Sequence, residues 1–105
     1  MILACTDIEA GSIDSSNVEE LKSTLDGLFE RGVYRIVVDL EKVEFIASSG
    51  FGCLRIARDT ALGNGGDIIF ADATRRVREI FELLGIASIL RFAPNLTGAL
   101  EWMRK

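Results

Sequence analysis

Two adjacent serines and two glycines lie where a buried segment of this chain is expected to give way to a helix. Residues 45–53 read FIASSGFGC. The first N–H groups of a helix have no intrahelical acceptor, and serine is a favoured residue to cap them. These groups, together with the helix dipole, also favour an anion, including a phosphate on the serine itself. Ser48 and Ser49 therefore have two interpretations, a plain helix cap or a phosphorylation switch.

The chain lacks the partners that a catalytic serine needs. It has no histidine, which removes Ser-His-Asp and Cys-His arrangements and most transition-metal catalytic sites. Arg55 stands where a G-x-G-x-x-G fingerprint needs its third glycine, and no G-K-[ST] sequence occurs. The elbow G-x-S-x-G fails because Ile46 and Ala47 occupy its first position for the two serines. We expect no enzyme and no cofactor; a small nucleotide-binding or hydrolytic protein is the most distant alternative.

Metal, disulfide and nucleic-acid chemistry are also disfavoured. Cys5 and Cys53 are the only cysteines and form no C-x-x-C pair, so we expect neither a disulfide framework nor a metal site. Cys53 is expected to pack as a small apolar residue on a helix face. The net charge of −4 at pH 7 argues against the basic surface that nucleic-acid binding needs.

Length and hydropathy indicate one cytoplasmic domain. With 105 residues, 49% of them hydrophobic, the chain can build one core, and we expect a single domain over residues 1–105. No apolar run approaches the roughly 20 residues that cross a bilayer. The N-terminus lacks the basic start and the apolar run of a signal peptide. We therefore expect a cytoplasmic location and no direct membrane insertion.

Strand and helix patterns alternate along the chain. Apolar spacing over residues 18–29 predicts an amphipathic helix, preceded by an S-x-x-E capping box at 16–19 and ended by Gly32. Further helices are expected from residue 49, over 77–84, and after Asn95 or Thr97 as the cap. Strands are expected around residues 2–8, over 34–40 and 68–71, and near 89–92. The alternation predicts an α/β domain with a largely parallel sheet.

Three other features have a structural and a functional interpretation. Asp39 ends a buried strand, where ligands often bind in α/β sheets, but a local hydrogen bond to the backbone is favoured. Three arginines crowd one helix start against the dipole, and a solvated face is favoured for them (Arg75, Arg76, Arg78). Phe51 is as well suited to the core as to an exposed anchor.

In their order, these elements and motifs resemble the STAS family, the domain of anti-sigma factor antagonists and related bacterial regulators. Residues 11–14 (GSID) resemble the family's G-x-[LI]-D element, and residues 36–46 resemble the strand and lead-in that follow. Residues 48–52 (SSGFG) resemble the D-S-S-G-L-G signature. Gly65-Gly66, the helix ending at Gly85 and Ala99-Leu100 follow in the family's usual order, so the match spans nearly the whole chain.

The resemblance implies a mixed, mostly parallel sheet of four or five strands with helices packed mainly on one side. It implies that Ser48, the first serine of the signature, is phosphorylated by an anti-sigma factor with serine kinase activity. The unphosphorylated form then binds that partner and releases the sigma factor, and phosphorylation switches the binding off. By the same match, Asp14, Ser48, Ser49, Gly50 and Phe51 lie at or beside the partner-binding surface.

The chain departs from the family pattern at two places. The signature usually begins with Asp, but Ala47 stands there. Ala47 adds weight to the alternative of a STAS adaptor without a phosphoswitch, such as the small cytosolic subunit of a lipid-transport ABC complex. Family members also carry a short strand before the Gly11 element. Because only ten residues precede Gly11, we expect the sheet to lack that edge strand or to rebuild it by association.

Overall fold

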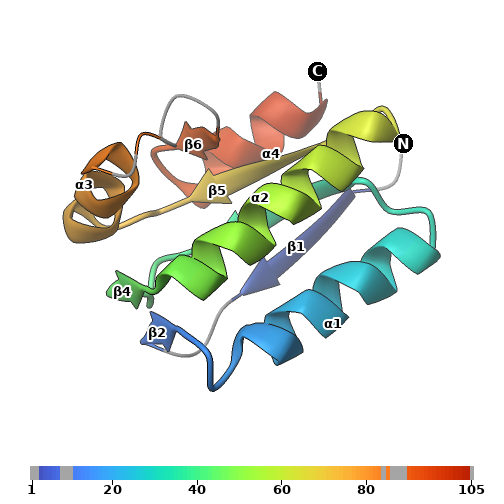
Figure 1. Cartoon of the computed structure of the whole chain (residues 1–105). Helices are drawn as coiled ribbons and strands as arrows, with labels where there is room; N and C mark the ends of the chain where they lie inside the picture. The colour runs from blue at the N-terminus through green and yellow to red at the C-terminus, as the bar shows by residue number, and fades with distance from the viewer. Residues whose placement is uncertain (1–2, 8–10, 84, 86–89, 105) are drawn as a thin grey trace.

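Helices and strands alternate along the chain, as the apolar spacing predicts (Figure 1). The computed structural model describes residues 3–7, 11–83, 85 and 90–104. Four residues that the sequence pattern assigns to elements lie outside that part of the chain: Ile2, Ile8, Leu84 and Ile89. In chain order the elements are β1 (Leu3–Asp7), β2 (Ser12–Ile13), α1 (Val18–Glu30), β3 (Arg35–Asp39), β4 (Phe45–Ile46), α2 (Ser48–Gly63), β5 (Asp67–Ala71), α3 (Arg75–Leu83), β6 (Arg91–Ala93) and α4 (Leu96–Arg104).

Four strands form one parallel sheet in the order β1-β3-β5-β6. The expected parallel α/β architecture is therefore confirmed. The strand β1 pairs with β3 along its whole length, from Leu3 beside Arg35 to Asp7 beside Asp39. The opening strand expected around residues 2–8 is confirmed over Leu3–Asp7, so the second expectation, that the sheet lacks an N-terminal edge strand, is wrong. The short strands β2 and β4 form a separate parallel ladder.

The sheet is covered on both faces, with more helices on one face than on the other. On β3, Ile36 and Val38 join the larger core beneath α1, α2 and α3, whereas Val37 faces α4. β5 alternates in the same way, which explains the unbroken apolar runs in both strands. Figure 1 shows α1 and α2 in front of the sheet and α4 behind it. Within the described residues, no helix combines the length and apolar character needed to cross a membrane.

The helix ends follow the sequence prediction at some positions and depart from it at others. α1 ends as predicted, with Gly32 at φ 76° and the N–H groups of Gly32 and Val33 donating to carbonyls of the last turn. Its start differs from the predicted capping box. Asn17 is the N-cap residue and makes no side-chain cap bond, while Ser16 Oγ donates to the Asp14 carboxylate instead.

Asn95, and not Thr97, caps α4. Its Oδ1 accepts the Gly98 N–H at 2.7 Å, and its carbonyl accepts the Ala99 N–H at 3.1 Å. We predict that Asn95→Ala lowers the free energy of unfolding by about 1 kcal/mol, because one helix-start N–H loses its acceptor. Thr97→Ala is the matched control and should change it by less than about 0.5 kcal/mol. Urea unfolding followed by circular dichroism measures both; equal effects of the two variants would contradict the assignment.

Candidate functional site

The two serines occupy the first turn of α2, but neither caps the helix. Ala47 holds the N-cap position in an extended conformation (φ −78°, ψ 165°), and no side chain makes a cap bond there. The N–H groups of Gly50 and Phe51 both donate to the Ala47 carbonyl, at 2.9 and 3.2 Å. Ser48 and Ser49 are exposed. The interpretation of either serine as a cap is therefore wrong, because the chain turns into the helix one residue earlier.

The first turn of α2 rests directly on the small β2–β4 ladder. Gly50 is buried, and a Cβ placed there would lie 2.7 Å from Cγ2 of Ile13 and 2.8 Å from Cγ2 of Ile46. Both isoleucines are almost fully buried. Only glycine lets the helix backbone approach this closely, so the glycine that follows the two serines has a packing role.

Backbone bonds extend the ladder on both sides of β2 and β4. The Glu44 N–H donates to the Gly11 carbonyl at 2.7 Å, and the Ala47 N–H donates to the Ile13 carbonyl at 2.8 Å. Together with the paired residues of β2 and β4, these bonds tie residues 11–13 to residues 44–47. The serine turn is thus fixed to the segment that carries Asp14, although the two are more than thirty positions apart in the sequence.

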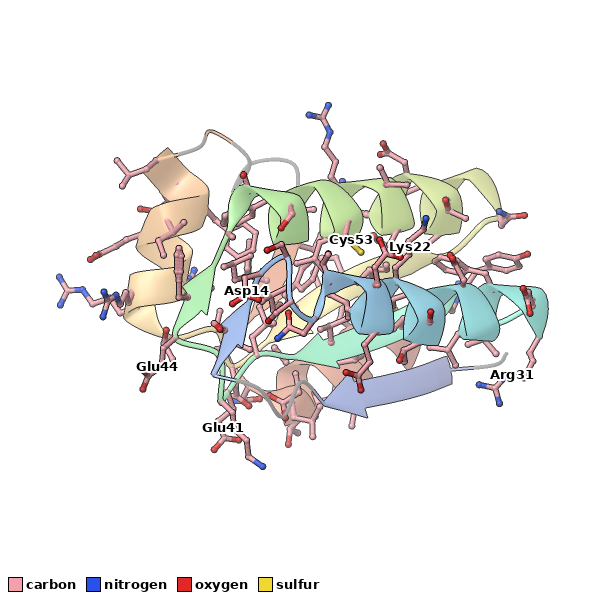
Figure 2. The ribbon with its side chains drawn as sticks, turned by 60° about the horizontal axis from the view of Figure 1, so that its bottom comes forward. Asp14, Lys22, Arg31, Glu41, Glu44 and Cys53 are labelled. Carbon is pink, nitrogen blue, oxygen red and sulfur yellow. The ribbon has the colours of Figure 1, made fainter. Side chains whose placement is uncertain are left out.

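Asp14 organises the turn between β2 and α1. Its carboxylate accepts hydrogen bonds from the Ser16 N–H at 2.9 Å, from Ser16 Oγ and from Ser12 Oγ at 3.1 Å. Its own N–H donates to Asn17 Oδ1 at 2.9 Å. The hydrogen bonds from Ser16, and then that from Ser12, lower the pKa of Asp14 from its ordinary value of 3.8. Asp14 is therefore ionised at neutral pH and lies at the same end of the molecule as Glu41 and Glu44 (Figure 2).

Phe51 belongs to the core. Its side chain is 6% exposed, and its ring meets that of Phe81 edge to face with centroids 4.6 Å apart. The alternative of an exposed anchor at Phe51 is therefore corrected: this residue supports the serine turn from beneath. The large apolar side chains that do face solvent on either side of the serines are Phe45, 46% exposed, and Ile56, 68% exposed. Sequence reasoning missed the exposure of both residues. Apolar periodicity predicts which residues are buried, and it carries little information about a two-residue strand such as β4.

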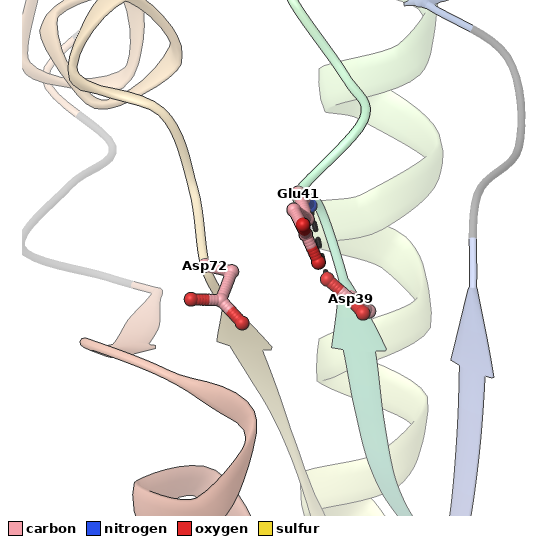
Figure 3. A group of neighbouring side chains, drawn as sticks. All are labelled: Asp39, Glu41 and Asp72. Carbon is pink, nitrogen blue, oxygen red and sulfur yellow. Dashed lines mark hydrogen bonds between the residues drawn. The ribbon is translucent and has the colours of Figure 1, made fainter.

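Asp39 lies in a group of three carboxylates at the carboxyl ends of β3 and β5 (Figure 3). Ligand oxygens of Asp39, Glu41 and Asp72 lie within 4.8 Å of one another, a spacing that a divalent cation could bridge. Asp39 Oδ1 accepts the Glu41 N–H at 2.9 Å, which agrees with the favoured role of a local backbone acceptor. Glu41 is exposed and the other two are half-buried, so water can solvate all three.

The remaining candidates are explained by local contacts. Arg75 pairs with Glu79 along α3 at 3.2 Å and is almost fully exposed, as expected of a solvated face. The guanidinium of Arg78 lies 6.0 Å from the centre of the Phe92 ring. Cys53 is half-buried between the helices, and burial, followed by the charge of Asp26, raises the pKa of its thiol. A thiol with a raised pKa is a weak nucleophile at neutral pH, which fits a packing role.

Known proteins share this sequence pattern and this fold. The STAS domain family model matches residues 10–99, so the chain belongs to the STAS family. BtrV of Bordetella bronchiseptica, which carries the name anti-sigma factor antagonist, is 29% identical over 94% of this chain and 83% of its own length. The fold is similar to that of a Thermotoga maritima protein carrying the same name (TM-score 0.86, 18% identity, 96% of this chain and 88% of the other).

A third relative has been solved in two chemical states. The anti-sigma factor antagonist SpoIIAA in its unphosphorylated form has a TM-score of 0.78 and 21% identity, over 95% of this chain and 86% of the other. The phosphorylated form of the Bacillus protein has a TM-score of 0.69 and 19% identity, over 93% and 87%. At these identities the structural likeness shows that the chain shares the fold of these proteins.

We predict that Gly50→Ala destabilises the protein because the new methyl group overlaps two buried isoleucine side chains. Overpacking of this kind costs about 1–3 kcal/mol of unfolding free energy. Gly52→Ala is the matched control, since Gly52 is exposed, lies in the same helix and has no atom within 4 Å of the place that a methyl group would take. The control should be neutral or stabilising by up to about 1 kcal/mol. Urea denaturation compares the two, and a wild-type midpoint for Gly50→Ala would contradict the packing.

A second prediction concerns the titration of Asp14. The pKa of Asp14 is lower in the folded than in the unfolded protein. Its hydrogen bonds therefore stabilise the fold fully at a pH above the unfolded-state pKa, and this stabilisation is lost as the pH falls through the folded-state pKa. A carboxyl-carbon NMR titration should give a pKa below 3.8 for Asp14. Ser16→Ala should raise it towards 3.8, while Ser15→Ala, an exposed neighbour, should leave it unchanged. A midpoint at or above 3.8 in the wild type would exclude the hydrogen-bonded turn as the cause.

Proposed function

We propose that this protein is a regulator that binds an anti-sigma factor with serine kinase activity and is switched off when that partner phosphorylates Ser48. In the unphosphorylated form it binds the partner and frees the sigma factor. The surface for this binding is formed by Ser48 and Ser49 with Asp14 beside them, supported from beneath by Gly50 and Phe51. The protein acts by binding, and no cofactor is needed for that role.

The observation that carries the proposal is the position of Ser48. Its side chain is exposed in the first turn of α2, with no side chain capping the helix. A kinase can reach a hydroxyl in this position without unfolding the domain. The named relative and the SpoIIAA pair add support, since one of those structures is of a phosphorylated form.

A phosphate on Ser48 would change the surface more than the fold. It adds about −1.5 to −2 charges. The first N–H groups of α2 and its dipole receive that charge favourably, so the helix start should persist. In a protein–protein interface, by contrast, an unfavourably placed charge costs several kcal/mol, and about 1.4 kcal/mol is tenfold in affinity. One phosphate is therefore enough to dissociate a complex of micromolar affinity.

One observation favours a second candidate, a STAS adaptor without a phosphoswitch, such as the small subunit of a lipid-transport ABC complex. The position that an acid occupies in the family signature is the N-cap of α2, and here Ala47 offers no side-chain acceptor. If the kinase reads that acid, or if the acid orients the serine, phosphorylation of Ser48 would be inefficient. The exposed helix start would then serve constitutive binding.

We predict that the wild type and Ser48→Ala each capture one prominent partner from an extract of the source organism. Ser48→Asp should capture at least tenfold less of that partner. Quantitative mass spectrometry of the captured proteins measures this ratio. Ser23→Asp is the matched control, because it adds the same charge at an exposed position on another helix, α1.

Incubation of the purified partner with ATP and this protein then separates the two candidates. A single phosphate mapped to Ser48 supports the switch. Equal capture by Ser48→Asp, together with no phosphate on Ser48, would refute the switch in favour of the adaptor.

A further inference from the structure

Two exposed apolar side chains flank the serines on the outer surface of the protein. Phe45 lies in β4, three residues before Ser48, and is 46% exposed although its neighbour Ile46 is buried. Ile56 lies in α2, seven residues after Ser49, and is 68% exposed. Seven residues are close to two helical turns, so Ile56 and Ser49 share one face of the helix, with the exposed Gly52 between them.

The dimensions of this strip suit a single interface. Three extended residues span at most about 10 Å from Phe45 to Ser48. Eight helical residues add about 12 Å from Ser48 to Ile56. One side of a standard protein interface buries about 800 Å², a patch roughly 30 Å across, so both apolar side chains fit within one footprint centred on the serines. Gly52 adds no side chain to this strip, and the exposed Arg55 directly precedes Ile56.

The charge around the strip is negative. The two segments tied together by the β2–β4 ladder, extended along α2 to Ile56 (residues 11–20 and 39–56), contain six acids, one lysine and one arginine, Arg55. Because the whole chain has a net charge of −4, these segments account for its excess of negative charge. Figure 2 shows Asp14, Glu41 and Glu44 at this end of the molecule. α3, which packs beside β4, adds three arginines and two glutamates and leaves the sign unchanged.

From these observations we infer that Phe45 and Ile56 are the apolar anchors of the partner interface, and that the partner presents apolar pockets within a basic rim. This inference rests on the proposed function and adds the chemistry of its partner. Anchors of this type supply most of the affinity of an interface, whereas rim charges mainly steer association. It also gives the switch a cause: a phosphate on Ser48 would stand between two anchors that need close, dry contact.

The test uses the partner that Ser48→Asp loses, purified after its identification. Phe45→Ala and Ile56→Ala should each weaken its binding about tenfold or more, chiefly through faster dissociation. Leu62→Ala, 45% exposed at the far end of the same helix, and Trp102→Ala, 53% exposed on α4, are matched controls and should stay within about twofold. Glu44→Lys should slow association, and the association rate of the wild type should fall as salt rises. Thermal melting of every variant verifies that it is folded, as expected for exposed positions.

The outcomes separate the two claims. If Ser48→Asp abolishes binding while both anchor variants bind like the wild type, the anchors are overturned and the proposed function stands. If Ser48→Asp loses no partner at all, the proposed function fails and the anchors fail with it. Sedimentation of the free protein tests whether a second copy of this chain binds the same face. A dimer that Phe45→Ala dissociates would show that it does, and this result would also overturn the inference.

Discussion

The contact between the backbone of α2 and the β2–β4 ladder determines the shape of the surface that we propose binds the partner. Gly50 brings the helix close enough to Ile13 and Ile46 that a single added methyl group would overlap both. This approach fixes where the helix begins, and therefore where Ser48 and Ser49 emerge. The ladder in turn brings the Asp14 turn beside the serines. A two-stranded ladder outside the main sheet thus holds the serines and the Asp14 turn in a fixed relative position.

A rigid support beneath the serines suits a site that works by presenting a surface. Phe51 packs edge to face on Phe81, so the first turn of α2 is joined to α3 as well as to the ladder. With the helix start held from below, a change in charge on Ser48 has few ways to propagate into the sheet. The change in charge therefore alters the binding free energy of a partner on this surface more than the stability of the fold, as an affinity switch requires.

The sequence predicts the framework of this fold better than it predicts the surface of the site. β3 and β5 are recognisable because a strand covered on both faces must be apolar throughout, and α1 and α3 because their apolar spacing is regular. The β2–β4 pairing is not predictable, because two-residue strands have no period. Helix caps are ambiguous where several candidates adjoin: Asn17 and Ala47 hold positions that the pattern assigned to serines. The exposure of Phe45 depends on which side of a short ladder it occupies, which composition does not encode.

The central claim is that a phosphate on Ser48 alters the binding surface and leaves the fold intact. The most direct test is to prepare the protein with phosphoserine incorporated at position 48 and to compare its amide NMR spectrum with that of the unmodified chain. We predict shifts confined to residues 11–16 and 44–53, with the amides of β3 and β5 unchanged and the melting temperature preserved. Broad shifts through β3 and β5, or a lower melting temperature, would contradict the claim.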